Sequence, residues 1–157
     1  MKTEKLHVQY NLNYILIAVK SQIEDYKLAY FLNKSSFFLF QRMSKDLSCL
    51  INEKTVYFSS FYDINPDLKK ESFLIKNQAL YLSNRSSQVG LFSGSDITNT
   101  AFLIPELKDF DYFIKLIGVW KEAETLDLKN FITSLKIVDS SININVNQLR
   151  SRNNLVF

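Results

Sequence analysis

With 157 residues, of which 46% are hydrophobic and 22% charged, the chain has the size and composition of one globular domain rather than of a disordered protein. Its three glycines form no nucleotide-binding fingerprint, and one cysteine and one histidine exclude a disulfide framework and a two-histidine metal motif. The net charge of +3 is lower than a dedicated nucleic-acid-binding protein usually carries.

The predicted elements begin with a strand over residues 14–20, whose continuous apolar and β-branched run indicates burial on both faces. Ser21, followed three residues later by Glu24, forms a capping-box pattern that predicts a helix over residues 22–34. Asp25 in the first turn of this helix suits the positive end of the helix dipole.

The next part of the chain is rich in residues that favour β-structure. Residues 45–53 could form a helical turn or a loop, and residues 65–67 (Asn-Pro-Asp) predict a turn. Four short strands are predicted around them, over residues 37–42, 55–62, 72–76 and 79–82. The last two of these could also form one strand with a bulge.

A segment over residues 83–100 holds two of the three glycines and many serines, so we expect a long mobile loop there. Strands are predicted over residues 101–104 and 112–118, and alternating apolar residues predict a last strand over residues 141–147. Between them a helix is predicted over residues 126–138, where apolar residues recur on one face: Leu128, Phe131, Ile132 and Leu135.

This order of elements, β-α-β-β-β, a long loop and then β-β-α-β, predicts an α+β fold. We expect a mainly antiparallel sheet of about six to seven strands with two helices packed on one face, in a single domain over residues 1–157. The sequence contains no apolar stretch long enough for a secretory signal or a membrane span, and with a lone cysteine this predicts a cytoplasmic protein.

The first predicted helix carries apolar residues on two opposite sides. One cluster is Leu28, Phe31 and Leu32, and the other is Ile23, Tyr26 and Tyr30. A helix that only covers a sheet needs one apolar stripe. The second stripe therefore either packs under other segments of the chain or binds a partner.

Few residues could support catalysis. His7 is expected to be a partly exposed strand residue, and Cys49, in an apolar run, an unreactive buried thiol. One short acidic segment contains Glu106, Asp109 and Asp111. Its carboxylates could hold a divalent metal or divide the roles of general acid and general base, as in a metal-dependent hydrolase. The simpler interpretation is a solvated turn. We therefore expect no enzyme, no cofactor and no metal site.

Three segments form a recognisable set: residues 24–33, Ile104-Pro105-Glu106 with Asp111-Tyr112, and residues 149–157. Together they resemble the bacterial IPExxVDY family, named for its motif, over nearly the full chain. The spacing within the motif is one residue longer here, and Phe110 takes the place of the valine. The resemblance implies a soluble, cytoplasmic, single-domain protein and transfers no catalytic residue.

The same motif has a physical interpretation of its own. Pro105 cannot donate to a sheet ladder and ends the strand that includes Ile104. Glu106 can accept backbone N–H bonds, Asp111 can organise a turn, and Tyr112 begins the next strand with a hydroxyl that needs a partner if it is buried. These roles describe a rigid connector between strands or a docking site.

We expect a non-enzymatic adaptor or accessory protein that binds another protein, in a process the sequence does not identify. The candidate contact residues are Ile23, Tyr26, Tyr30, Leu91, Phe92 and Phe157. The alternative is an RNA-associated protein that uses Arg150 and Arg152, which would share one face of an extended tail. No membrane association is expected, and the oligomeric state is left open.

Overall fold

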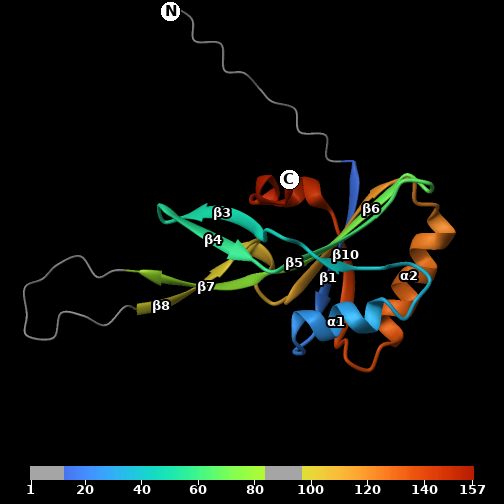
Figure 1. The fold of residues 1–157 in the computed structure, drawn as a ribbon, viewed down its shortest axis with the longest axis horizontal. Helices are drawn as coiled ribbons and strands as arrows, with labels where there is room; N and C mark the ends of the chain where they lie inside the picture. The colour runs from blue at the N-terminus through green and yellow to red at the C-terminus, as the bar shows by residue number, and fades with distance from the viewer. Residues whose placement is uncertain (1–12, 84–96) are drawn as a thin grey trace, which may run out of the picture.

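The computed structural model describes residues 13–83 and 97–157 (Figure 1), and within these ranges it confirms the predicted α+β class. Six strands form the main sheet, entirely antiparallel, in the spatial order β10-β1-β9-β6-β5-β2. In chain order they are β1 (Tyr14–Lys20), β2 (Gln41–Arg42), β5 (Ser60–Asn65), β6 (Lys70–Lys76), β9 (Tyr112–Gly118) and β10 (Ser140–Ile144).

Two antiparallel ribbons accompany the sheet. The first pairs β3 (Leu47–Ile51) with β4 (Lys54–Phe58), and the second pairs β7 (Gln78–Ser83) with β8 (Ile97–Phe102). In Figure 1 both ribbons lie on the left of the molecule, and the second extends away from the body.

The central strands β1, β9 and β6 are buried on both faces, because a separate layer covers each face of the sheet. Helices α1 (Asp25–Leu32) and α2 (Glu122–Ser134) pack on one face, as predicted. The β3–β4 ribbon and the C-terminal segment 146–157 pack on the other (Figure 1). Alternate residues of one strand therefore enter different cores, as Ile114 and Phe113 of β9 do.

Helix α1 begins at Asp25, three residues later than predicted, because the capping box does not form. Ser21 is held by distant partners instead. Its N–H donates to Asp111 Oδ2 at 2.9 Å, and its hydroxyl donates to the Ile137 carbonyl at 2.6 Å. Helix α2 lies four residues earlier than predicted, and its expected apolar face is confirmed: Leu128 and Ile132 are buried, with Phe131 and Leu135 packed beside them.

Several strand limits also differ from prediction. Residues 45–53, left open as a turn or a loop, contain strand β3, and the run 55–62 is divided at Ser59 between β4 and β5. Residues 97–100, expected in the long loop, begin β8, while residues 84–96 lie outside the described ranges. No helix in the described ranges is long and apolar enough to cross a membrane.

Candidate functional site

Helix α1 presents one buried side and one exposed side. Leu28, Ala29 and Leu32 enter the core, whereas Tyr26 and Tyr30 are 57% and 59% exposed. The two tyrosines lie one helical turn apart, so both occupy the same side of the helix. The second apolar stripe predicted from the sequence is thus present at the surface, at least for these two residues.

Ile23, the third member of that stripe, is not an exposed residue. It precedes the helix and packs, partly buried, against the core beneath α1 and α2. Its carbonyl accepts a 2.5 Å hydrogen bond from the hydroxyl of Tyr112. Ile23 therefore anchors the start of the helix rather than extending its surface.

Two lysines border the exposed tyrosines. Lys34 Nζ lies 4.6 Å from the ring centre of Tyr30, and Lys27 Nζ lies 5.7 Å from that of Tyr26. Lys27 also pairs with Glu24 at 2.8 Å; this contact lowers the pKa of the Glu24 carboxyl and raises the pKa of the Lys27 ammonium. We call Tyr26, Lys27, Tyr30 and Lys34 the α1 outer face.

The other predicted contact residues do not join the α1 outer face. Phe157 packs edge-on against Phe73, with ring centres 5.0 Å apart, on the opposite face of the sheet. Leu91 and Phe92 lie outside the described ranges, as does His7. The predicted contact set thus does not form one continuous surface among the described residues.

The segment from Ile104 to Tyr112 is a rigid connector that ties separate parts of the fold together. After the buried Ile104, Pro105–Leu107 forms a single 3-10 turn. The Glu106 carboxylate accepts the Ser151 N–H at 2.8 Å, which fixes the C-terminal segment, and Asp111 accepts the Ser21 N–H at 2.9 Å, which fixes the junction before α1. These contacts support the connector interpretation of the motif.

The titration properties of this connector follow from its packing. Partial burial opposes ionisation of Glu106, but the backbone N–H donors around it have the larger combined effect and lower the pKa of this carboxyl. Burial raises the pKa of the Tyr112 hydroxyl, and the nearby carboxylates of Asp25 and Asp111 raise it further. Tyr112 therefore remains a neutral hydrogen-bond donor.

Asn77, which the sequence analysis did not single out, organises the same connector. It is fully buried between β6 and β7. Its Nδ2 donates to the carbonyls of Leu107 and Phe110 at 3.0 and 2.9 Å, and its Oδ1 accepts the Ile104 N–H at 2.9 Å. The sequence signal for this role was a polar residue between two apolar strands. The hydrogen-bond partners themselves lie some 30 residues away in the chain, so the local sequence does not identify them.

The three acidic residues of this region do not converge. Glu106 and Asp111 bind different backbone segments, and Asp109 is exposed. Over residues 13–83 and 97–157, no group of three or more His, Cys, Asp or Glu side chains is arranged to hold a metal ion. The geometry offers no support for the metal-dependent hydrolase considered from the sequence.

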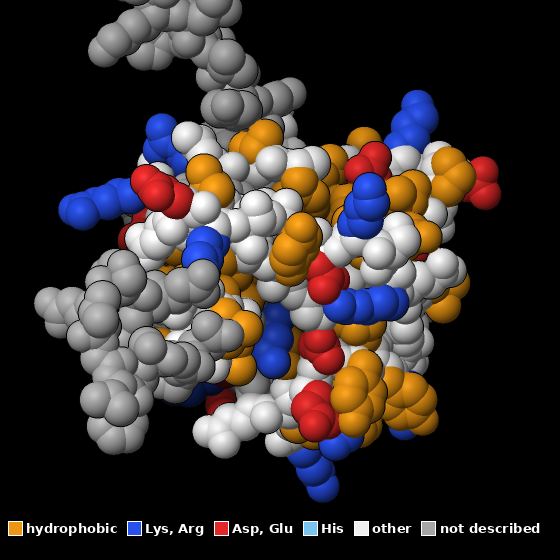
Figure 2. Space-filling model, turned by 60° about the vertical axis from the view of Figure 1, so that its left-hand side comes forward, with side chains coloured by type: hydrophobic (Ala, Val, Ile, Leu, Met, Phe, Trp, Pro, Cys, Tyr) orange, Lys and Arg blue, Asp and Glu red, His pale blue; other side chains and the backbone are white. Residues whose placement is uncertain are grey.

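The tail that carries Arg150 and Arg152 is not extended, contrary to expectation. Arg152–Leu155 forms a 3-10 turn, and Arg152 donates to the Asn147 carbonyl at 3.1 Å. Both arginines are exposed, but the Glu106 carboxylate binds the backbone between them. On the face shown in Figure 2, the described residues mix basic, acidic and hydrophobic side chains and present no continuous basic surface.

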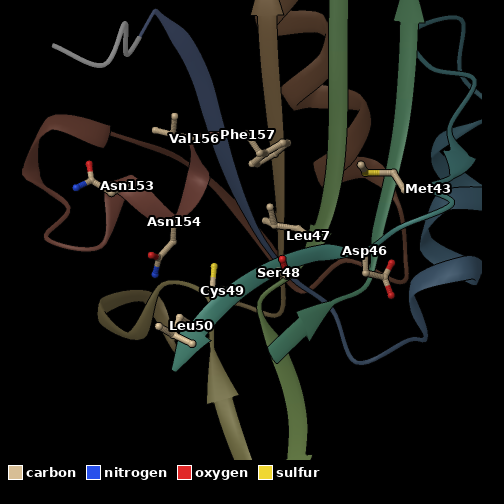
Figure 3. A pocket seen from close by; sticks show the side chains of 10 residues that line it. All are labelled: Met43, Asp46, Leu47, Ser48, Cys49, Leu50, Asn153, Asn154, Val156 and Phe157. Atoms are coloured by element: carbon tan, nitrogen blue, oxygen red, sulfur yellow. The ribbon is translucent and has the colours of Figure 1, made fainter. Parts of the chain in front are cut away.

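An open pocket of about 560 Å³, called the cavity below, lies between β3 and the C-terminal segment (Figure 3). Its wall combines apolar and polar side chains: Met43, Asp46, Leu47, Ser48, Cys49, Leu50, Asn153, Asn154, Val156 and Phe157. Cys49 is partly rather than fully buried, and burial raises the pKa of its thiol, which favours the unreactive protonated form.

Next to this cavity lies a buried lysine that the sequence analysis also missed. Lys115 of β9 is 3% exposed, and its Nζ donates to the Leu155 carbonyl at 2.6 Å. Aromatic rings surround the ammonium, with ring centres 4.1 Å (Phe157), 4.7 Å (Tyr14) and 5.9 Å (Phe73) away. Burial lowers the pKa of Lys115 to about 8. The signal in the sequence was one lysine inside an otherwise apolar strand.

Comparison of the chain with protein-family models, with curated proteins and with solved structures found no match. The resemblance to the IPExxVDY family stays a proposal that depends on the three segments described above.

Proposed function

We propose that this protein is a non-enzymatic, cytoplasmic adaptor or accessory protein that binds another protein through the α1 outer face. The observation that carries the proposal is a pair of tyrosines, Tyr26 and Tyr30, each more than half exposed on the same side of a helix. Tyrosine is enriched at protein interfaces because its ring covers much apolar area while its hydroxyl can still form a hydrogen bond.

The α1 outer face is supported from beneath. Leu28 and Leu32 are fully buried in the core, and Asp25 binds the Ser59 hydroxyl and lies 4.0 Å from Arg42. A helix held in this way presents its tyrosines in a fixed arrangement before a partner arrives. Such preorganisation reduces the entropy lost on binding.

The charge of the surface favours a partner with acidic groups. The Lys27 ammonium is already paired with Glu24, but Lys34 has no ion-pair partner within the described ranges. Its ammonium lies over Tyr30 and 5.1 Å from the ring centre of Phe31. A carboxylate of the partner that approaches Tyr30 would meet this cation, which favours correct orientation and faster association.

The test is affinity capture from the native cytoplasm with a photo-crosslinking amino acid at position 26. We expect a crosslinked protein that survives nuclease treatment, and we expect the double variant Tyr26→Ala/Tyr30→Ala to reduce its recovery at least tenfold. The melting temperature should change little, because both side chains are mainly exposed. The matched control, Tyr57→Ala/Leu80→Ala, removes two side chains elsewhere that are slightly more exposed than the tyrosines and should retain the partner.

Two outcomes contradict the proposal. Equal recovery by the tyrosine double variant and the wild type would show that α1 does not bind the partner. Recovery that disappears after nuclease treatment, and that weakens steeply with salt, would favour the RNA-associated alternative through Arg150 and Arg152.

A further inference from the structure

The surroundings of Lys115 leave most of its hydrogen-bonding capacity unused. An ammonium has three N–H donors, and within residues 13–83 and 97–157 only one is engaged, by the Leu155 carbonyl. No described carboxylate lies within ion-pair distance of Nζ, and the more distant Glu71 carboxylate only partly offsets the effect of burial on the pKa of Lys115. A buried charge without a counter-ion is costly to the fold, and such groups concentrate at binding and catalytic sites.

A second unsatisfied group lies beside the lysine. The Tyr14 hydroxyl is buried and has no hydrogen-bond partner among the described residues, and the Lys115 ammonium is 4.7 Å from the Tyr14 ring centre. Burial raises the pKa of Tyr14, and the positive charge of Arg152 partly offsets that rise. A buried ammonium and a buried hydroxyl without a partner thus belong to two side chains in contact, and an anion could accept hydrogen bonds from both.

One side chain, Phe157, contacts the Lys115 ammonium and also lines the cavity of Figure 3. Its ring covers the ammonium at 4.1 Å. Phe157 is 43% exposed and Val156 is 41% exposed, so their movement would uncover little core. Rotation of Phe157 would join the cavity to the lysine. Ligands can make such minor conformations dominant.

We propose that this region is a binding site for a small amphiphilic carboxylate. The carboxylate accepts hydrogen bonds from Lys115 Nζ and Tyr14 Oη, and the apolar body displaces Phe157 and occupies the cavity, where it meets Met43 and Leu47. The cavity volume of about 560 Å³ is in the range of small-molecule sites. This site lies on the opposite face of the sheet from the α1 outer face and is independent of the proposed interface.

Cys49 provides a direct report of cavity occupancy, because it is the only cysteine of the chain and forms part of the cavity wall. The experiment measures the rate at which iodoacetamide alkylates Cys49 in the full chain, with decanoate as the probe, below its micelle concentration. Calorimetry measures the affinity. We expect decanoate to bind and to slow alkylation several-fold, and 1-decanol, which lacks the carboxylate, to bind at least tenfold more weakly.

Variants identify the head-group contacts. Lys115→Met should weaken decanoate binding at least tenfold and Tyr14→Phe several-fold, whereas Phe157→Ala should strengthen it, because the competing ring is removed. The matched control is Lys45→Met, which removes the same charge from an exposed lysine just before β3 and should bind decanoate like the wild type.

Three outcomes would overturn the proposal. One is no protection of Cys49 by decanoate in either the wild type or Phe157→Ala. Another is equal binding of decanol and decanoate, which would make the cavity a purely apolar site. The third is an equal effect of Lys115→Met and Lys45→Met. If Lys115→Met fails to fold, Tyr14→Phe and the decanol comparison still decide the result.

Discussion

Replacing Lys115 by methionine is expected to stabilise the protein at neutral pH. The side chain lies on β9 between Leu16 and Phe73 of the neighbouring strands, where water does not reach its ammonium. Methionine has a similar length, fills the same apolar surroundings and carries no charge. The substitution also removes the hydrogen bond to the Leu155 carbonyl, which has a smaller and opposite effect.

The magnitude follows from the pKa of Lys115. A fall from the ordinary value of 10.5 to about 8 means that the folded protein binds the proton less tightly than the unfolded chain. At pH 7 both states are protonated, and the wild type carries the full penalty, about 3 kcal/mol. As the pH rises from 8 to 10.5, Lys115 loses its proton in the folded state before it does so in the unfolded chain. The free energy of unfolding therefore increases over this range, and the penalty disappears.

Urea denaturation of the wild type and of Lys115→Met between pH 6.5 and 10.5 tests this reasoning. We expect the variant to be more stable by about 1–3 kcal/mol at pH 7, after allowance for the lost hydrogen bond, and the difference to shrink toward zero near pH 10. Comparison at each pH cancels the other titrating groups. A variant that is less stable than the wild type by the same amount at every pH would refute the argument.

Three further substitutions test the packing that supports both sites. Asn77→Ala should cost about 2–3 kcal/mol in urea denaturation, because it leaves the Phe110 carbonyl and the Ile104 N–H without partners, while the Leu107 carbonyl keeps the Phe110 N–H; a loss below about 1 kcal/mol would show that water replaces the side chain. Gly118→Ala should lower the melting temperature markedly, since its φ of +101° disfavours alanine and a Cβ would overlap the Lys69 carbonyl, and an unchanged melting curve would contradict this. Tyr112→Phe should cost about 1–2 kcal/mol and speed amide exchange first at the start of α1, where its hydroxyl binds the Ile23 carbonyl; uniform exchange would argue against that local role.

The sequence predicted elements best where one local pattern dominated. Strand β1 was predicted with its observed limits, because a short, continuous apolar run rich in β-branched residues favours a strand buried on both faces. The inner face of α2 and the burial of Leu28 and Leu32 in α1 were also predicted from helical spacing, whereas Phe31, predicted on the same side of α1, is only partly buried. Ser21 shows the opposite case: its capping pattern was sound locally, but Asp111 and Ile137, each about 90 or more residues away, bind its N–H and hydroxyl instead.

The exposed tyrosine pair on α1 was likewise visible in the sequence, since the helical period alone separates Tyr26 and Tyr30 from Leu28 and Leu32. Phe157 was assigned to the same contact set only because it is apolar and close to the chain end. Its actual neighbours, Phe73 and Lys115, depend on how the C-terminal segment crosses the sheet. Periodicity carries no information about such crossings.

By itself, then, the sequence determined the α+β class, the two-sided burial of the first strand and the two-sided character of the first helix, because these depend on spacing between near neighbours. Only the tertiary structure decided that Asn77 organises the connector and that Lys115 and Tyr14 share a buried position beside a cavity. Those relations join residues on separate strands and on the C-terminal segment. They arise from the order of strands in the sheet and from the layer that covers its second face.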